Sequence, residues 1–352
     1  DAIRKDSGIA FDVADYRDIA AEFGTLASAD ALIRDAHALG IRVIIDIVPN
    51  HTSHRHRWFA AAVAAGPGSR ERARYLFRPG RGPSGDLPPN NWRSLFGGPG
   101  WTRVTERDGT PGEWYLHLFD VTQPDLDWSN RDVRDEFVDV LRFWFDRGID
   151  GFRIDVAHGL VKDPALPDLV YADNGEPFAV GHPPGHHPYN DRDGLREIYR
   201  EWRTVADSYD GDRIFVAEAW VDTPDRLAPY VSPGQLHSAF DFAYLQAPWS
   251  GPKLRAIIDS SRRTIGSVGA HNTWVLSNHD VERHLTRFGR KMTAGSLLED
   301  PPADPAQVDL ALGTRRSRAA VMLTLALPGG AYLYQGEELG LPQVLDLPES
   351  AL

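Results

Sequence analysis

The stretch "GFRIDVAHG" (151–159) places an arginine and an aspartate, Arg153 and Asp155, among mostly apolar neighbours. Successive side chains in a β-strand point to opposite faces, so residues 153 and 155 share one face. The apolar neighbours predict a strand buried on both faces, where an unpaired charge is costly. A guanidinium beside Asp155 favours the charged form of that carboxylate, so Asp155 is expected to stay an anion.

Strand-like and helix-like segments alternate on both sides of this stretch. Short β-branched or aromatic runs predict strands at 41–48, 149–156, 213–218, 237–243, 273–277 and 331–335. Helical spacing predicts helices from about 28 to 40, after Asn130 as far as Gly148, over roughly 193–208 and over 315–327. In the first of these helices, Leu32, Ile33, Ala36 and Leu39 mark one expected apolar face. Six strands alternating with helices predict an α/β fold, a (β/α)8 TIM barrel with about six of its eight strands.

One segment interrupts this alternation. Residues 49–130 are rich in Gly, Pro, Asn and Arg and separate one strand from its following helix. A connection of that length predicts an inserted subdomain, not a bare loop. The expected division is therefore a first part of the barrel at 1–50, a loop-rich subdomain at 51–130 and the rest of the barrel at 131–352. The residues before 41 are expected to hold only a loop and a helix.

Composition excludes several classes of function. The chain has 352 residues, a net charge of −12 and no cysteine. The acidic balance argues against a nucleic-acid partner, and no apolar run reaches the roughly 20 residues of a membrane helix. The absence of cysteine excludes disulfides, thiol catalysis and cysteine metal ligands, and it fits a cytoplasmic location. No metal site is predicted, and the oligomeric state stays open.

Polar residues gather at the predicted carboxyl ends of the strands, where barrels of this class carry their chemistry. These are Asp46, Asn50 and His51, then Arg153 and Asp155, then Glu218, then Asn278, His279 and Asp280. Three carboxylates without a thiol, a serine triad or a phosphate loop leave metal-assisted hydrolysis or glycoside hydrolysis. Aromatic residues beside turns favour sugar, although each could equally serve packing: Trp92, Trp101, Trp114, Trp128 and Trp220.

The segments "DIVPNH" (46–51), "GFRIDVAH" (151–158), "VAEAW" (216–220) and "SNHD" (277–280) resemble, in this order, four signature segments of the α-amylase family of glycoside hydrolases, family thirteen. "QPDLDW" (123–128) resembles a fifth, and "YQGEELGL" (334–341) is similar to the α-glucosidase and oligo-1,6-glucosidase branch. The resemblance implies a retaining exo-α-glucosidase that removes terminal glucose from small α-glucoside oligosaccharides by double displacement.

The resemblance also implies roles for individual residues. Asp155 would be the nucleophile, Glu218 the general acid and then the general base, and Asp280 a carboxylate that holds sugar hydroxyls. Further pocket-lining residues would be His51, Phe119, Gln123, Arg153 and His279, while Asp46 and Asn50 would orient the pocket wall. No cofactor is implied, because two acids supply the nucleophile and the proton transfers.

Two quantities follow from these roles. Glu218 must be protonated at the working pH, so its site is expected to raise its pKa. A retaining enzyme also requires its two carboxyl groups to lie roughly 5–5.5 Å apart.

The chain departs from the family pattern at its ends. Two barrel strands, an N-terminal calcium loop and a C-terminal β-sandwich domain are expected in the family and have no counterpart here. The chain is therefore expected to be a truncated fragment that is unstable or inactive alone. The segment "DSGIAFD" (6–12) also departs, since Phe11 falls where the branch has a tyrosine.

Several functional alternatives stay open. Val156, directly after the expected nucleophile, resembles α-1,6-cleaving members, whereas the surrounding "DVAHGL" resembles maltose-type enzymes. An α-1,4 preference is favoured, with α-1,6 as the alternative. A transglycosylase or isomerase of the trehalose synthase type shares the same covalent intermediate. A non-catalytic relative is disfavoured because all three acids are present, and a truncated gene product is the remaining alternative.

Overall fold

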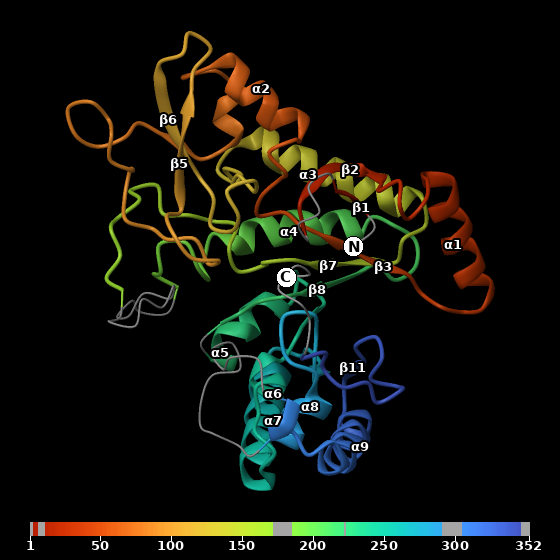
Figure 1. The fold of residues 1–352 in the computed structure, drawn as a ribbon. Coiled ribbons are helices and arrows are strands. Elements are labelled where there is room, and N and C mark those ends of the chain that lie inside the picture. The colour runs from red at the N-terminus through yellow and green to blue at the C-terminus, as the bar shows by residue number, and fades with distance from the viewer. Residues whose placement is uncertain (1–2, 6–10, 172–184, 222, 291–304, 346–352) are drawn as a thin grey trace. The chain divides into compact units, whose positions relative to one another are not determined.

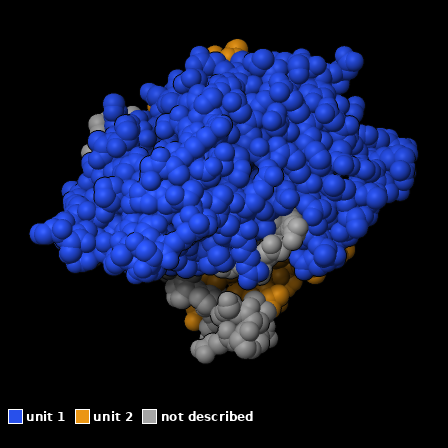
Figure 2. Space-filling model, turned by 90° about the horizontal axis from the view of Figure 1, so that it is seen from above, with its two compact units in different colours: residues 1–221, 234–236 blue, residues 222–233, 237–352 orange. Residues whose placement is uncertain are grey.

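The structure is a computed structural model that describes residues 3–5, 11–171, 185–221, 223–290 and 305–345. The chain separates into two compact units, which Figure 2 shows in different colours. The first unit comprises residues 1–221 and 234–236, and the second comprises residues 222–233 and 237–352. The sequence pattern does not signal this boundary, which differs from the predicted limits at 50 and 130.

The first unit contains a parallel sheet of three strands, β3 (Ile44–Ile47), β7 (Gly151–Ile154) and β8 (Ile214–Ala217). β7 lies between the other two, as Figure 1 shows, and every residue in it is buried. A side chain at Gly151 would collide with the backbone of Ile214, so glycine permits the close approach of β8. All three predicted strands are confirmed.

Three predicted helices are confirmed in this unit: α1 (Leu26–Ala38), α3 (Arg131–Asp146) and α4 (Leu195–Ala206). The Asn130 side chain caps α3 by accepting a hydrogen bond from the Asp132 amide. The predicted apolar face of α1 is buried only in part. Ile33 is buried, but Leu32 is 65% and Leu39 is 77% exposed. Packing of this helix on the described residues is therefore confined to the side that carries Ile33.

The segment after β3 is ordered. It forms α2 (Arg57–Ala65), the 3-10 helix η1 (Arg72–Arg74) and an antiparallel sheet of β4 (Phe77–Arg78), β6 (Pro111–Leu116) and β5 (Trp101–Thr105). An apolar cluster that includes Trp92, Trp101 and Leu116 packs beside this sheet. Trp92, Trp101 and Trp128 are 2% exposed, so these three serve packing and are closed to sugar.

The expectation of only a loop and a helix before residue 41 is wrong. β2 (Val13–Ile19) pairs antiparallel with β1 (Ile3–Lys5), with two irregularities in the register. Only Val13 and Tyr16 of β2 are buried, so the segment lacks the two-residue alternation that signals a strand. The Tyr16 hydroxyl donates to the carbonyls of Val48 and His51 and so ties β2 to the end of β3.

The second unit contains the three remaining predicted strands, β9 (Ser238–Ala239), β10 (Thr273–Val275) and β11 (Gly330–Tyr332). β10 and β11 pair in parallel, and Phe240 bridges Thr273 in parallel. The helices are α5 (Pro224–Leu227), η2 (Ala228–Val231), α6 (Phe242–Leu245), α7 (Gly251–Ser267), α8 (His284–Gly289), η3 (Pro305–Gln307) and α9 (Leu310–Ala326). α9 contains most of the helix predicted at 315–327.

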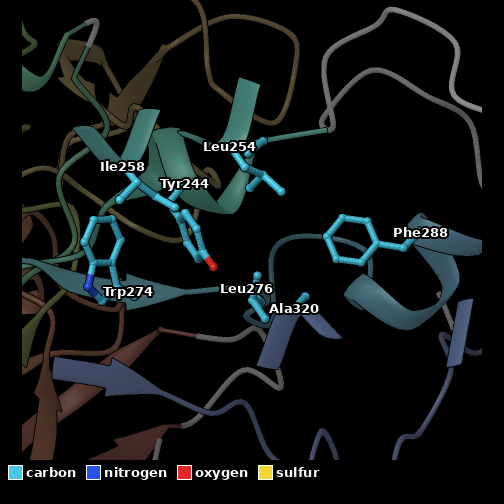
Figure 3. Close-up of a cluster of buried hydrophobic side chains, with 8 residues drawn as sticks. Tyr244, Leu254, Ile258, Trp274, Leu276, Phe288 and Ala320 are labelled. Carbon is cyan, nitrogen blue, oxygen red and sulfur yellow. The ribbon is translucent and has the colours of Figure 1, made fainter. Parts of the chain in front are cut away.

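An apolar cluster forms the core of this unit (Figure 3). Its buried members are Tyr244, Ala247, Leu254, Ile258, Trp274, Leu276, Phe288 and Ala320. They come from β10 and the residue after it, from α6 and its following turn, and from α7, α8 and α9. No helix in the described parts of the chain is both long and apolar enough to cross a membrane.

Candidate active site

The carboxyl ends of β7 and β8 place two acids side by side. Asp155 directly follows β7, and Glu218 directly follows β8. The ladder of backbone hydrogen bonds continues through both residues, from the Asp155 amide to Ile47 O at 2.9 Å and from the Glu218 amide to Ile154 O at 3.0 Å. Because three parallel strands end at one edge of the sheet, residues distant in the sequence meet there. Asp155 and Glu218 are hereafter the acid pair.

A single guanidinium joins the acid pair. Arg153 Nη1 donates to Asp155 Oδ1 at 2.7 Å, and Arg153 Nη2 lies 2.9 Å from Glu218 Oε2. Arg153 Nε lies 3.6 Å from Asp46 Oδ1 on β3. All three side chains of the Arg153–acid-pair group are buried. The predicted Arg153–Asp155 pair is therefore confirmed, and it extends to the second acid.

Three donors surround the Glu218 carboxylate. Besides Arg153, the Val156 amide donates to Oε2 at 3.0 Å and Trp220 Nε1 donates to Oε1 at 3.1 Å. Burial by itself raises the pKa of Glu218, but Arg153 and the Val156 amide outweigh it, and the pKa lies below its ordinary value. The prediction that this site raises the pKa of Glu218 is wrong for the ligand-free protein.

The opposite holds for Asp155. Burial and the neighbouring charge of Glu218 raise the pKa of Asp155 well above its ordinary value, and Arg153 offsets only part of that rise. The two buried acids share one guanidinium and titrate as a coupled pair, and Glu218, which has more donors, is the acid whose ionised form is better stabilised. The expected effect of Arg153 is present, since the guanidinium lowers the pKa of Asp155, but burial and the charge of Glu218 outweigh it.

Val156 holds an unusual backbone conformation. Its φ is +46°, in the left-handed region that a β-branched residue rarely adopts. The conformation brings the Val156 amide to Glu218, 62 positions later in the sequence. Local strain of this kind is typical of functional sites, and it links the expected specificity position directly to the acid pair.

His51 forms part of the wall beside this pair. Its ring is buried, and Nε2 donates to the Phe11 carbonyl at 3.2 Å. The Arg153 guanidinium lies 5.4 Å from the centre of the Phe11 ring. Burial lowers the pKa of His51 to about 4, so the imidazole is neutral at neutral pH. Phe11, which the sequence interpretation set aside, thus contacts both Arg153 and His51, while residues 6–10 lie outside the described residues.

Phe119 lies beside His51, and Gln123 is fixed by a hydrogen bond to the turn that follows Phe119. The rings of His51 and Phe119 are 5.1 Å apart between centroids. Gln123 is buried, and its Oε1 accepts from the Asp120 amide at 3.0 Å. Trp220 is a site residue that the sequence leaves undecided between packing and sugar contact. Its position two residues after Glu218 is the signal that could have assigned it.

The remaining expected site residues lie in the second unit. His279 and Asp280 follow β10, and His279 Nε2 lies 3.2 Å from Asp280 Oδ1. Both side chains are exposed, and Asn278 Oδ1 accepts from the Asp280 amide at 2.9 Å. Their roles in a sugar pocket stay predictions. Within the residues that the structure describes, no group of three or more His, Asp or Glu side chains could hold a metal ion.

Comparisons with known proteins identify the family. Residues 3–349 match the alpha amylase catalytic domain, and the chain belongs to this family. A solved alpha-glucosyl transfer enzyme, XgtA, superposes with a TM-score of 0.81 and 32% identity, over 97% of this chain and 60% of that one. The family match and the solved neighbours confirm the predicted (β/α)8 fold class.

Two of the matched curated proteins are a glucosidase and a sugar-phosphate hydrolase by name. The chain is 34% identical to oligo-1,6-glucosidase of Parageobacillus thermoglucosidasius, over 95% of this chain and 56% of that protein. It is 33% identical to trehalose-6-phosphate hydrolase of Bacillus subtilis (strain 168), over 99% of this chain and 58% of that protein. The chain thus spans a little over half the length of these curated relatives.

Proposed function

We propose that the protein is a retaining exo-α-glucosidase that releases terminal glucose from α-1,4-linked, or alternatively α-1,6-linked, oligosaccharides. The observation that carries the proposal is the acid pair bridged by Arg153 at the ends of two adjacent strands. Asp155 attacks the anomeric carbon, and Glu218 protonates the departing glycosidic oxygen and then activates water. His51, Gln123 and Arg153 bind sugar hydroxyls, and Phe119 contacts the apolar face of the sugar. The family resemblance gives Asp280 and His279 a role in binding hydroxyls.

The ligand-free pKa shifts have a consequence for this mechanism. The pKa of Asp155 is raised and that of Glu218 is lowered, whereas bond cleavage needs an anionic Asp155 and a protonated Glu218. A bound glycosidic oxygen only accepts hydrogen bonds, so it favours the protonated form of Glu218. The positive charge that develops at the anomeric carbon favours the anionic form of Asp155. The substrate and the developing charge therefore act against the ligand-free order of the two pKa values.

The proposal is tested by following the anomer of the released glucose by proton NMR, with maltose and isomaltose as substrates. Initial release of α-glucose supports retention, whereas initial release of β-glucose contradicts the double displacement. The ratio of the two hydrolysis rates decides the linkage. Replacing Val156 by threonine is expected to move that ratio toward maltose.

A second candidate, transfer of glucose to another sugar instead of water, is favoured by the similarity to the alpha-glucosyl transfer enzyme. Solved neighbours also include a trehalulose synthase, at 27% identity. New disaccharides formed at high maltose concentration, in place of free glucose, would establish transfer or isomerisation. A cytoplasmic location, expected from the sequence, stays a prediction.

A further inference from the structure

A buried ion pair contacts Asn50, the residue directly before His51. Lys162 lies in the connection after β7, and its Nζ atom is 2.7 Å from Asp125 Oδ2. The Lys162 side chain is 3% exposed and the Asp125 side chain is 0% exposed. Asp125 Oδ1 also accepts from the Leu118 amide at 2.9 Å. A fully desolvated pair of this kind adds little net stability, so its effect on the protein lies mainly in the groups that it positions.

The pair fixes the orientation of one amide. Lys162 Nζ donates to Asn50 Oδ1 at 2.6 Å, and Asn50 Nδ2 donates to Asp125 Oδ2 at 3.1 Å. An ammonium can only donate and a carboxylate can only accept. Turning the amide over would therefore place donor against donor and acceptor against acceptor. Lys162 and Asp125 together permit only one orientation of Asn50.

That orientation fixes the proton on His51. Asn50 Nδ2 lies 3.3 Å from His51 Nδ1 and can only donate to it, so Nδ1 is the unprotonated nitrogen. The proton then belongs to Nε2, which faces the Phe11 carbonyl. A sugar hydroxyl, which can donate or accept, would not by itself choose between the two tautomers. Where a sugar hydroxyl takes the place of the Phe11 carbonyl at Nε2, the choice between the tautomers is left to Asn50.

We propose that the Lys162–Asp125 ion pair is a positioning device that, together with the Phe11 carbonyl, holds His51 as the neutral imidazole with its proton on Nε2, and that a bound sugar hydroxyl takes the place of the Phe11 carbonyl as the acceptor of that proton. Lys162 is thus a positioning residue that acts through Asn50. That the acceptor is a sugar hydroxyl depends on the proposed function, whereas the assignment of the His51 tautomer does not. The charged groups that act on the ring are Asp125, Lys162 and Asp12.

The test is nitrogen-15 NMR of the protein labelled at histidine, with the His51 resonances assigned by their loss in H51Q. In the unsubstituted protein, Nε2 should be protonated and Nδ1 unprotonated from neutral pH down to about 4. K162M removes a cation and leaves the buried Asp125, so the pKa of His51 should rise by about one unit or more. D125N leaves the cation unopposed, so that pKa should not rise.

The matched control is K253M, which removes an exposed lysine of α7 and should leave His51 unchanged. If K162M or D125N fails to fold, the charge-neutral double variant K162M/D125N replaces it. There the Asn50 amide can turn, so a fraction of His51 should carry its proton on Nδ1. The Michaelis constant for maltose should then rise about three- to tenfold, with a smaller fall in kcat.

Three results would overturn the proposal. These are a proton on Nδ1 in the unsubstituted protein, equal shifts of the His51 pKa in K162M and D125N, or an unchanged Nδ1 resonance in the double variant. The two pKa shifts follow from the charges alone, so the tautomer of His51 in the double variant is the result that separates a positioning role from a merely structural one. The NMR measurement requires neither sugar nor turnover, so a failure of the glucosidase proposal leaves it interpretable.

Discussion

Two buried clusters, one in each unit, show opposite ways of filling a protein interior. In the first unit, Arg153 and the acid pair gather three ionisable groups at the ends of β7 and β8. In the second unit, eight apolar or aromatic side chains pack together (Figure 3), and the polar atoms of its tyrosine and tryptophan are bonded. Tyr244 Oη lies 2.8 Å from Thr324 Oγ1, and Trp274 Nε1 donates to Pro328 O at 3.0 Å.

The comparison shows which kind of buried cluster can hold reactive groups. The apolar cluster stabilises its unit, because all its members gain by leaving water. In the acid pair, satisfying one carboxylate opposes the other, and the two pKa values move in opposite directions. A group that cannot be fully satisfied in the ligand-free protein is one that a substrate can rearrange.

The largest expected effect is on activity at the acid pair. D155N and E218Q should each lower kcat for maltose by at least about a thousandfold, because each removes a group that acts in the transition state. Steady-state kinetics measures this loss. Activity within tenfold of the unsubstituted protein in either variant would contradict the assigned roles.

The same two variants should differ in stability. D155N removes a carboxylate whose raised pKa makes ionisation unfavourable in the folded state, so stability at neutral pH should rise by about 1 kcal/mol. E218Q leaves Arg153 and the Val156 amide with a neutral acceptor and should lower stability by about 1–3 kcal/mol. Denaturant unfolding of both variants checks the contrast. Equal changes in the two would show that the acids are equivalent.

A substitution in the apolar cluster of the second unit should change the free energy of unfolding. Trp274 is fully buried, and W274A should lower the free energy of unfolding by about 3–5 kcal/mol through lost burial and a cavity. M322A, on the same unit but 71% exposed, is the control and should change it by less than about 0.5 kcal/mol. A small effect of W274A on denaturant unfolding would show that the cluster collapses around the cavity.

The buried imidazole of His56 in the first unit adds a test based on the pH dependence of stability. Burial lowers the pKa of His56 from 6.5 to about 4, so between these values the unfolded chain binds a proton that the folded chain does not. His56 therefore costs stability as pH falls through this range, by about 3 kcal/mol in all. H56N keeps a side-chain cap for α2 and should remove that part of the acid sensitivity. Unfolding midpoints at pH 7 and pH 4 measure the difference.

The smallest expected effect is at Val156. V156G removes a β-branched side chain from a left-handed backbone, which relieves about 1–2 kcal/mol of strain, and the added chain entropy offsets about 1 kcal/mol. The net change in the free energy of unfolding should stay within about 1 kcal/mol. A loss of more than 2 kcal/mol would show that the Val156 side chain itself, and not its amide, holds the local structure.

Much of the fold was predictable because its signals are local. The β-branched runs at β3, β7 and β8 and the helical spacing of α3 identify elements without knowledge of their neighbours. β2 escaped prediction because its register is irregular and its apolar residues do not alternate. Leu32 and Leu39 stay exposed on the predicted face of the first helix, since helical spacing identifies an apolar stripe but not how much of it is covered.

The candidate site likewise contains residues that the sequence identified and residues that it did not. Asp155 and Glu218 were found from their positions after strands, whereas Phe11 and Lys162 were missed. Neither residue has a local signature, because each acquires its role only by meeting side chains far away in the sequence. Phe11 meets Arg153, and Lys162 meets Asn50 and Asp125.

The sequence by itself determined the strands and helices, the family and the identities of the acids, because those follow from residue type and spacing along the chain. Tertiary structure alone decided in which direction the pKa of each carboxylate moves and which nitrogen of His51 faces a donor. Protonation depends on burial and on the donors and charges within a few ångströms. Those neighbours are brought together by strand pairing and loop packing, not by their order in the chain.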